Sequence, residues 1–263
     1  MLLSATVTLA QTSTAYDSSY IVGESAYRNG RFAESVAHLR DAVRASSDSA
    51  EAWSLLSRAL YRDGKHLEAE RAIREAIRLV PIRSEYYTYL GLILTEQQRL
   101  DDATAAYFTA LSISPSDTDA RYNLGYIYHR RKQYPLALMQ FRRLKAEYPD
   151  FLDARFAIAT VLRDQGQFEA AVSELDNALA IDSTHAATWV EQGSLATHRR
   201  RYAEAVTMFQ RALDLDATNA RARYGLGLAY TFRREWVAAQ TQCDTLAIYD
   251  RELAAQLQRV ITP

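Results

Sequence analysis

The sequence predicts an all-α solenoid, a protein made of tandem helical hairpins that stack on one another. Three columns of side chains return every 34 residues without insertion or deletion. The first column holds only small residues: Gly23, Ser57, Gly91, Gly125, Ala159, Gly193 and Gly227. The second, 12 residues later, is also small, and the third, four residues further on, runs from Leu39 to Cys243 and is bulky or apolar. Three columns in one register indicate a true repeat.

Each period has the pattern of two amphipathic helices. In the fourth period, Leu124 and Tyr128 lie on one helical face, and Ala137 and Phe141 continue the apolar stripe on a second helix. Small residues at the facing positions let two helix backbones approach to roughly 8–10 Å. One hairpin cannot bury its apolar face alone, so neighbouring hairpins must stack into a continuous core.

The period also sets the expected division of the chain. We expect seven 34-residue repeats over residues 16–253 and a capping helix over residues 254–263. The apolar face of that helix would comprise Leu257, Val260 and Ile261. Residues 1–15 carry no charged side chain and are expected to form either a truncated signal peptide or a disordered leader. The signal-peptide interpretation favours export to the periplasm over a cytoplasmic location.

Composition argues against catalysis and against metal or cofactor chemistry. The net charge is −1, and the single cysteine excludes an internal disulfide framework and a thiolate zinc site. The five histidines form no i, i+4 metal pair, and the chain has no P-loop, G-x-S-x-G or dinucleotide motif. No apolar run is long enough to span a bilayer. We therefore expect no enzyme activity, no cofactor and no small-molecule substrate.

Two stretches resemble the tetratricopeptide repeat family. Residues 121–128 read RYNLGYIY and are followed by Tyr134, Ala137, Phe141 and Pro149. Residues 53–57 read WSLLS and are followed by Gly64, Ala69, Ala76 and Pro81. The resemblance implies a right-handed superhelix of antiparallel helix pairs. It also implies a concave groove, lined by the first helix of each pair, that binds a protein or peptide.

Several positions depart from the family pattern. Arg121, Arg155 and Arg223 stand where the family often has the tryptophan seen at Trp53 and Trp189. In addition, a glutamine (residue 192) replaces an apolar residue, and an arginine (residue 251) replaces the terminal proline of the last repeat. In the fourth to seventh repeats these departures limit what the family pattern predicts about local packing, but they leave the predicted fold unchanged.

Helical spacing, together with the geometry that the resemblance implies, places certain first-helix residues on the concave wall. These are Tyr122, Tyr126, His129, Arg130, Phe156, Thr160, Arg163, Asp164, Val190, Ser194, His198, Tyr224, Leu228 and Phe232. Aromatic rings offer a large contact area at low entropy cost, and arginine can form two bonds to a carboxylate. The wall predicts an extended or helical peptide partner with acidic residues. The alternative is that these tyrosines only pack along their own helices.

Basic residues gather in the turns of the fourth, sixth and seventh repeats and would align into a ridge. The ridge comprises Arg131, Lys132, Arg199, Arg200, Arg201, Arg233 and Arg234. One interpretation is structural, because a cation at a helix C-terminus stabilises the helix by roughly 0.3–1 kcal/mol. The other is a docking strip for an acidic partner, RNA or lipid head groups. We favour the structural interpretation.

The function predicted from these observations is a protein–protein interaction scaffold, with assembly of a bacterial envelope machine as one setting. An alternative is a regulatory subunit that presents substrates to a separate enzyme. RNA binding through the basic ridge is the less favoured alternative, and it would show a steep salt dependence.

Overall fold

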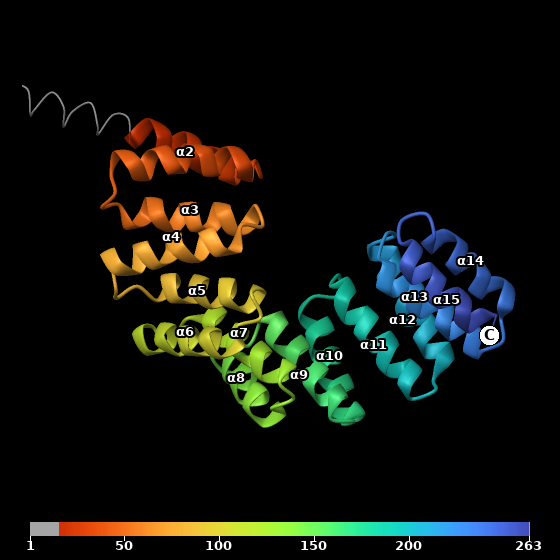
Figure 1. Ribbon diagram of the computed structural model, residues 1–263. Helices are drawn as coiled ribbons and strands as arrows, with labels where there is room; N and C mark the ends of the chain where they lie inside the picture. The colour runs from red at the N-terminus through yellow and green to blue at the C-terminus, as the bar shows by residue number, and fades with distance from the viewer. Residues whose placement is uncertain (1–15, 263) are drawn as a thin grey trace, which may run out of the picture. The chain divides into compact units, whose positions relative to one another are not determined.

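The computed structural model describes residues 16–262, and this part of the chain is helical without any strand (Figure 1). The predicted leader lies outside the described residues. Residues 16–28 form the first helix. The others are α2 (Phe32–Ala45), α3 (Ala50–Arg62), α4 (His66–Leu79), α5 (Ser84–Glu96), α6 (Leu100–Ile113), α7 (Thr118–Arg130), α8 (Tyr134–Glu147), α9 (Leu152–Asp164), α10 (Phe168–Ile181), α11 (Ala186–His198), α12 (Tyr202–Leu215), α13 (Ala220–Phe232), α14 (Trp236–Leu246) and α15 (Arg251–Ile261).

The chain divides into two compact units, unit 1 (Met1–Arg131) and unit 2 (Lys132–Pro263). In unit 1, α3 packs on α4 and α5 on α6, and each hairpin packs on the next. In unit 2, α9 pairs with α10, α11 with α12 and α13 with α14, and α15 covers the last hairpin. The first helices of successive hairpins also contact one another, and we call this layer the first-helix wall of each unit. The all-α hairpin solenoid predicted from the sequence is confirmed.

The small-residue columns mark where the two helices of a hairpin approach most closely. A Cβ atom on Gly91 would lie 2.6 Å from the ring of Tyr107, which is fully buried. The hydroxyl groups of Ser35 and Ser57 donate across the hairpin to backbone carbonyls 12 residues away, each at 2.8 Å. Larger side chains at these positions would force the helices apart.

The arginines that replace tryptophan preserve a hydrogen bond of the repeat. Trp53 Nε1 donates to the carbonyl oxygen of Ser47 at 3.0 Å, six residues earlier, and so fastens the loop that precedes its helix. The same bond to the residue six positions back is made by Tyr87, Arg121, Arg155, Trp189 and Arg223. The arginines therefore keep this contact of the repeat, because the guanidinium donates where the indole would.

The unusual glutamine of the sixth repeat is also satisfied. Gln192 is 4% exposed, and its Nε2 donates to Asp176 Oδ1 at 2.6 Å. Because a buried amide without a partner would cost roughly 1–3 kcal/mol, this bond accounts for the tolerance of a polar side chain there.

The last helix starts earlier than the sequence analysis expects. Helix α15 begins at Arg251, because the carboxylate of Asp250 accepts a hydrogen bond from the backbone N–H of Leu253 at 2.9 Å and caps the helix. Leu257 and Ile261 are buried against the last hairpin as predicted. Val260 is 37% exposed, so its assignment to the buried face was wrong.

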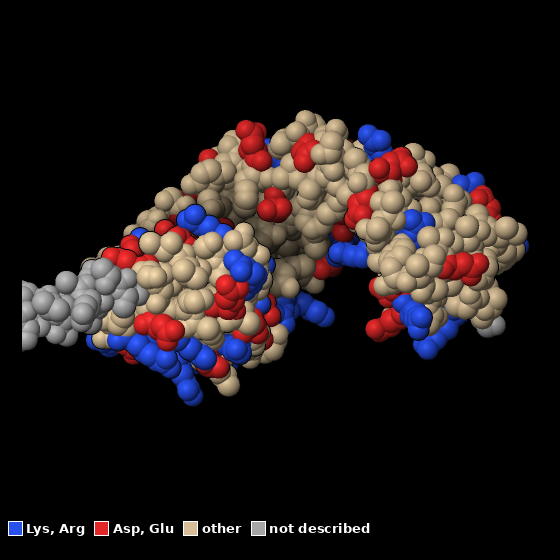
Figure 2. All heavy atoms as spheres, turned by 90° about the horizontal axis from the view of Figure 1, so that it is seen from above, with Lys and Arg blue, Asp and Glu red and all other residues tan. Residues whose placement is uncertain are grey.

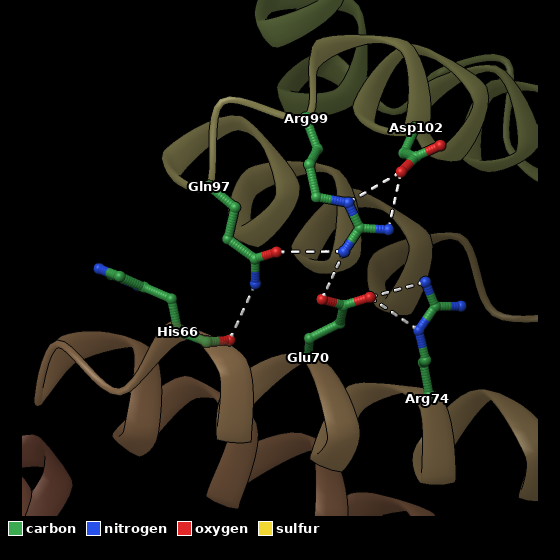
Figure 3. Close-up of polar contacts among 6 residues, drawn as sticks. All are labelled: His66, Glu70, Arg74, Gln97, Arg99 and Asp102. Atoms are coloured by element: carbon green, nitrogen blue, oxygen red, sulfur yellow. Dashed lines mark hydrogen bonds and ion pairs between the residues drawn. The ribbon is translucent and has the colours of Figure 1, made fainter.

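A polar network joins the second and third repeats (Figure 3). Glu70 of α4 is largely buried, and its carboxylate accepts hydrogen bonds from Arg74 at 2.8 Å and from Arg99 at 2.9 Å. Gln97, in the same turn as Arg99, donates to the backbone carbonyl of His66 at 3.2 Å. Burial alone raises the pKa of Glu70, but hydrogen bonds from Arg74, Gln97 and Arg99 outweigh it and hold the pKa below its ordinary value.

We predict that Gly91→Ala destabilises unit 1 by roughly 1–2 kcal/mol, although alanine is the better helix former. The added Cβ would collide with the Tyr107 ring. Urea denaturation followed by circular dichroism measures the change. The loss of stability in the double variant Gly91→Ala/Tyr107→Leu should be smaller than the sum of the losses in the two single variants. The reason is that the smaller leucine side chain relieves the collision. Full additivity would contradict this packing.

We predict that Glu70→Gln lowers the stability at neutral pH by about 1–2 kcal/mol, a modest value because both arginines are partly exposed to solvent. The pKa of Glu70 is lower in the folded state than in the unfolded chain. Its contribution is therefore present above the unfolded value of about 4.3 and is lost as the pH falls through the folded value. Denaturation midpoints of the two proteins should converge in acid, and a constant difference would contradict the prediction.

Candidate functional site

A pocket of about 690 Å³ lies in the first-helix wall of unit 2. Helices α11 and α13 form its sides, and α12, α15 and the turn between α11 and α12 supply further residues. The lining comprises Val190, Ser194, Thr197, His198, Arg200, Tyr202, Phe209, Arg221, Tyr224, Gly225, Leu228, Phe232 and Leu253. Six of the residues predicted for the groove are among them: Val190, Ser194, His198, Tyr224, Leu228 and Phe232.

The floor of this pocket is shaped by two glycines and one phenylalanine. The ring of Phe209 projects from α12 between α11 and α13. A Cβ atom on Gly193 would lie 2.7 Å from that ring, and one on Gly225 would lie 2.4 Å from it. The absence of side chains at these two positions lets the ring enter the wall and form an apolar floor.

The rim of the pocket is held by stacked rings. Phe232 stacks on Tyr202 with ring centroids 5.1 Å apart, and His198 stacks on Phe168 at 6.1 Å. Stacked pairs of this kind contribute about 0.5–1.5 kcal/mol beyond their buried area. The aromatic rim is therefore fixed before a ligand arrives, which reduces the entropy lost on binding.

The charge at the pocket is positive. No aspartate or glutamate lines it, whereas Arg200 and Arg221 do. Neither guanidinium forms an ion pair with any described residue. An apolar floor with two unpartnered guanidinium groups suits a ligand that has an apolar group beside a carboxylate.

A smaller pocket of about 110 Å³ adjoins the first one and shares Val190 and Arg221 with it. Phe156, another predicted groove residue, lines this smaller pocket together with the buried carboxylate of Glu191. Glu191 is bound by Arg163, so the guanidinium expected to meet a ligand is already engaged in a buried ion pair. The hydroxyl of Thr160 donates within its own helix, to the carbonyl of Phe156 at 3.0 Å.

The predicted groove residues of the fourth repeat lie on α7, in unit 1. Tyr126 is 45% exposed, and the guanidinium of Arg130 lies over its ring at 5.9 Å. Arg130 also donates to the side chain of Gln98 at 2.7 Å. Tyr122 and His129 are partly buried on the same helix.

The basic ridge is largely neutralised by acidic neighbours. Arg131 pairs with Asp101 at 2.6 Å and Arg199 with Glu169 at 3.2 Å, and each pair joins two successive repeats. Arg201 and Arg233 pair with nearby glutamates, Glu204 and Glu235. On the face drawn in Figure 2, basic and acidic residues lie interspersed. These pairs support the structural interpretation of the ridge.

The three remaining ridge residues share an unusual backbone conformation. Lys132, Arg200 and Arg234 have φ values of 57°, 58° and 63°, in the left-handed region that favours glycine. Glycine occupies the equivalent position in the first, second and fifth repeats, at Gly30, Gly64 and Gly166. None of the three basic residues forms an ion pair with the described part of the chain. Three repeats thus have a basic residue at a left-handed position where glycine would have less backbone strain.

Sequence reasoning missed the part of the pocket that comes from outside the first helices, and it also missed Arg221 on one of them. Phe209 belongs to the bulky column of the repeat and lies on α12, and Leu253 lies on the last helix, α15. Arg221 lies near the start of α13, one turn before the predicted wall residues. One available signal was the glycine at 225, because the repeat itself requires a small residue only at position 227.

Comparison with known protein families settles the class of the chain. Profiles described as tetratricopeptide repeat match residues 23–81, 156–220, 196–261 and 119–150, and one described as TPR repeat matches residues 91–132. The chain belongs to the tetratricopeptide repeat family. Proteins of this family are generally non-catalytic scaffolds. No curated protein matches the sequence.

Solved structures with the same repeat share the fold. A tetratricopeptide repeat protein from Parabacteroides merdae covers 95% of this chain and 100% of its own, with a TM-score of 0.78 and 16% identity. PilF of Pseudomonas aeruginosa covers 81% of this chain and 97% of its own, with a TM-score of 0.66 and 17% identity. YrrB, described as a TPR protein with an unusual peptide-binding site, covers 70% and 95%, with a TM-score of 0.53 and 20% identity.

Two further properties of the chain bear on membrane and metal binding. No helix within residues 16–262 is both long enough and apolar enough to cross a membrane. The same residues contain no group of three or more histidine, cysteine, aspartate or glutamate side chains placed to hold a metal ion.

We predict that Arg234→Gly raises the free energy of unfolding by about 0.5–1 kcal/mol, because glycine adopts the left-handed conformation without steric cost. Thermal and urea denaturation measure the gain. Arg233→Gly serves as the control, since Arg233 lies one residue earlier, at a negative φ of −84°, and is paired with Glu235. The control should lose stability. A loss in Arg234→Gly as well would contradict the prediction.

Proposed function

We propose that this protein is a non-catalytic scaffold that binds a peptide segment of a partner protein in the first-helix wall of unit 2. The observation that carries the proposal is the pocket of about 690 Å³, whose apolar floor and fixed aromatic rim lie beside two unpartnered arginines. Pockets of this size commonly hold an apolar group with a few polar contacts that set its orientation.

The lining favours one kind of peptide. Leu228, Tyr224 and the Phe209 floor offer apolar contacts to a large aliphatic or aromatic side chain. Arg200 and Arg221 then favour an aspartate or glutamate nearby in the same segment, since a guanidinium binds a carboxylate with two parallel hydrogen bonds. The acidic preference expected from the sequence thus rests on Arg200 and Arg221 rather than on Arg163, which is engaged by Glu191.

RNA binding has less support. Nucleic acid requires a stretch of uncompensated positive charge. Four of the seven ridge residues are paired with carboxylates. The expectation of export rests on residues 1–15 alone and stays a prediction.

Peptide display against the full chain tests the proposal. We expect enrichment of sequences with a large apolar residue close to aspartate or glutamate. For the best selected peptide, fluorescence anisotropy should show at least tenfold weaker binding by Leu228→Ala and by Arg221→Gln.

The control is Val237→Ala, which shortens an apolar side chain that is 84% exposed on α14, away from the pocket lining. It should bind as tightly as the parent. Circular dichroism verifies that every variant remains folded. Equal affinity of the parent and both pocket variants would refute the assignment of the site.

A further inference from the structure

Unit 1 contains a second feature suited to recognition, which sequence reasoning did not identify. The guanidinium of Arg58, on α3, lies over the ring of Tyr27 at 5.3 Å and over the ring of Tyr89 at 5.0 Å. The three residues come from the first helices of three successive repeats. Arg58 also occupies the same place in its repeat as Leu228, which lines the pocket of unit 2. It therefore belongs to the first-helix wall.

The cation is held but not neutralised. Among the described residues, no carboxylate lies within ion-pair distance of Arg58, and no hydrogen bond satisfies its donors. Its Nε is buried without a partner. The two Nη atoms are not among the buried unsatisfied atoms, so they reach solvent and remain available to donate.

One ring comes from the repeat before Arg58 and one from the repeat after it, and both lie close to the guanidinium carbon. The rings attract the cation and shield it in part from water, and the edge that carries the two Nη groups stays accessible. They also hold the planar group in one orientation, so little side-chain freedom is lost when its Nη groups form bonds. A carboxylate is the group whose geometry matches that open edge.

The surroundings favour a carboxylate on a peptide over a polyanion. The carboxylate of Glu85, whose charge acts on Tyr89, is engaged by Arg83. The negative charges of Glu85 and Asp119 act on Tyr89. They would repel a run of phosphates, whereas one carboxylate in direct contact with Arg58 gains two short hydrogen bonds.

We propose that Arg58, clamped between Tyr27 and Tyr89, is a binding residue for an acidic side chain of a partner protein. The site lies in unit 1 and is independent of the apolar pocket of unit 2. The protein then offers two recognition points of different chemistry, a carboxylate receptor in unit 1 and an apolar anchor site in unit 2.

Nuclear magnetic resonance on the full chain tests this site. The probe is a short capped alanine peptide with one central glutamate, and the matched control peptide has glutamine in place of that glutamate. We expect the side-chain Nε–H signal of Arg58 to shift on titration with the acidic peptide and to remain in place with the control peptide. No shift with the acidic peptide overturns the proposal.

Variants give the second measurement. Arg58→Met should weaken acidic-peptide binding at least fivefold, and Arg58→Lys should weaken it nearly as much, because an ammonium lacks the planar edge. The control is Arg62→Met, on the same helix, whose exposed guanidinium lies over the single ring of Phe32 at 4.6 Å. It should leave the affinity unchanged.

Two results would overturn the binding role of Arg58. If Arg58→Met lowers the melting temperature but the folded variant keeps its peptide affinity, Arg58 is structural and the proposal is wrong. If Arg221→Gln abolishes the shift of the Arg58 signal, the peptide binds in unit 2 instead, and the proposal is equally wrong. Retention of the shift in Arg221→Gln supports it, whether or not the unit 2 pocket binds peptides.

Discussion

The close approach of two helix backbones in every repeat is the constraint on which the rest of this structure depends. It requires a small residue every 34 positions, and it leaves space that a ring from the facing helix fills, as Tyr107 does against Gly91. The same constraint creates the candidate site. In unit 2 a second glycine, Gly225, admits the Phe209 ring from the other side as well, and the ring becomes a pocket floor. The packing of the repeats and the shape of the candidate pocket therefore share one cause.

Most of the fold could be read from the sequence because side-chain size is what the packing selects. Small residues (Gly, Ala or Ser) that return every 34 positions identify which two helices pack together in each repeat. Positions that are selected for a hydrogen bond were harder to predict, because residues of different shape can supply the same donor. Arg223 and Trp189 share neither size nor polarity, yet each donates to the carbonyl six residues earlier. A pattern based on size treats the arginine as a departure, whereas the backbone carbonyl accepts either donor.

The candidate site was predictable only along single helices. Helical spacing placed Val190 with Ser194 and Tyr224 with Leu228, and these pairs do line one pocket. Contributions from other elements depend on how helices cross, and one sequence does not specify that crossing. Leu253 reaches the pocket from the capping helix, and Arg58 meets rings from the two neighbouring repeats. Both contacts join residues far apart in sequence, and the spacing within any one helix contains no sign of them.

The many arginines of this chain become informative once they are sorted by partner. Arg121, Arg155 and Arg223 hold loops, and Arg131 and Arg199 join successive repeats, so their charge and donors serve the fold. Arg58, Arg200 and Arg221 have no such partner among the described residues. Arg58 and Arg221 lie on first helices, and Arg200 lies in the turn after α11 and lines the pocket of unit 2. An unpaired guanidinium gives the folded chain no ion-pair energy, and Arg200 also carries the steric cost of a left-handed backbone. Arg234 shares both features with Arg200 but does not line the pocket of unit 2. The lack of an ion pair therefore does not by itself indicate a binding surface. Arg58, Arg200 and Arg221 are distinguished by their surroundings, which are two aromatic rings for Arg58 and a largely apolar pocket for the other two.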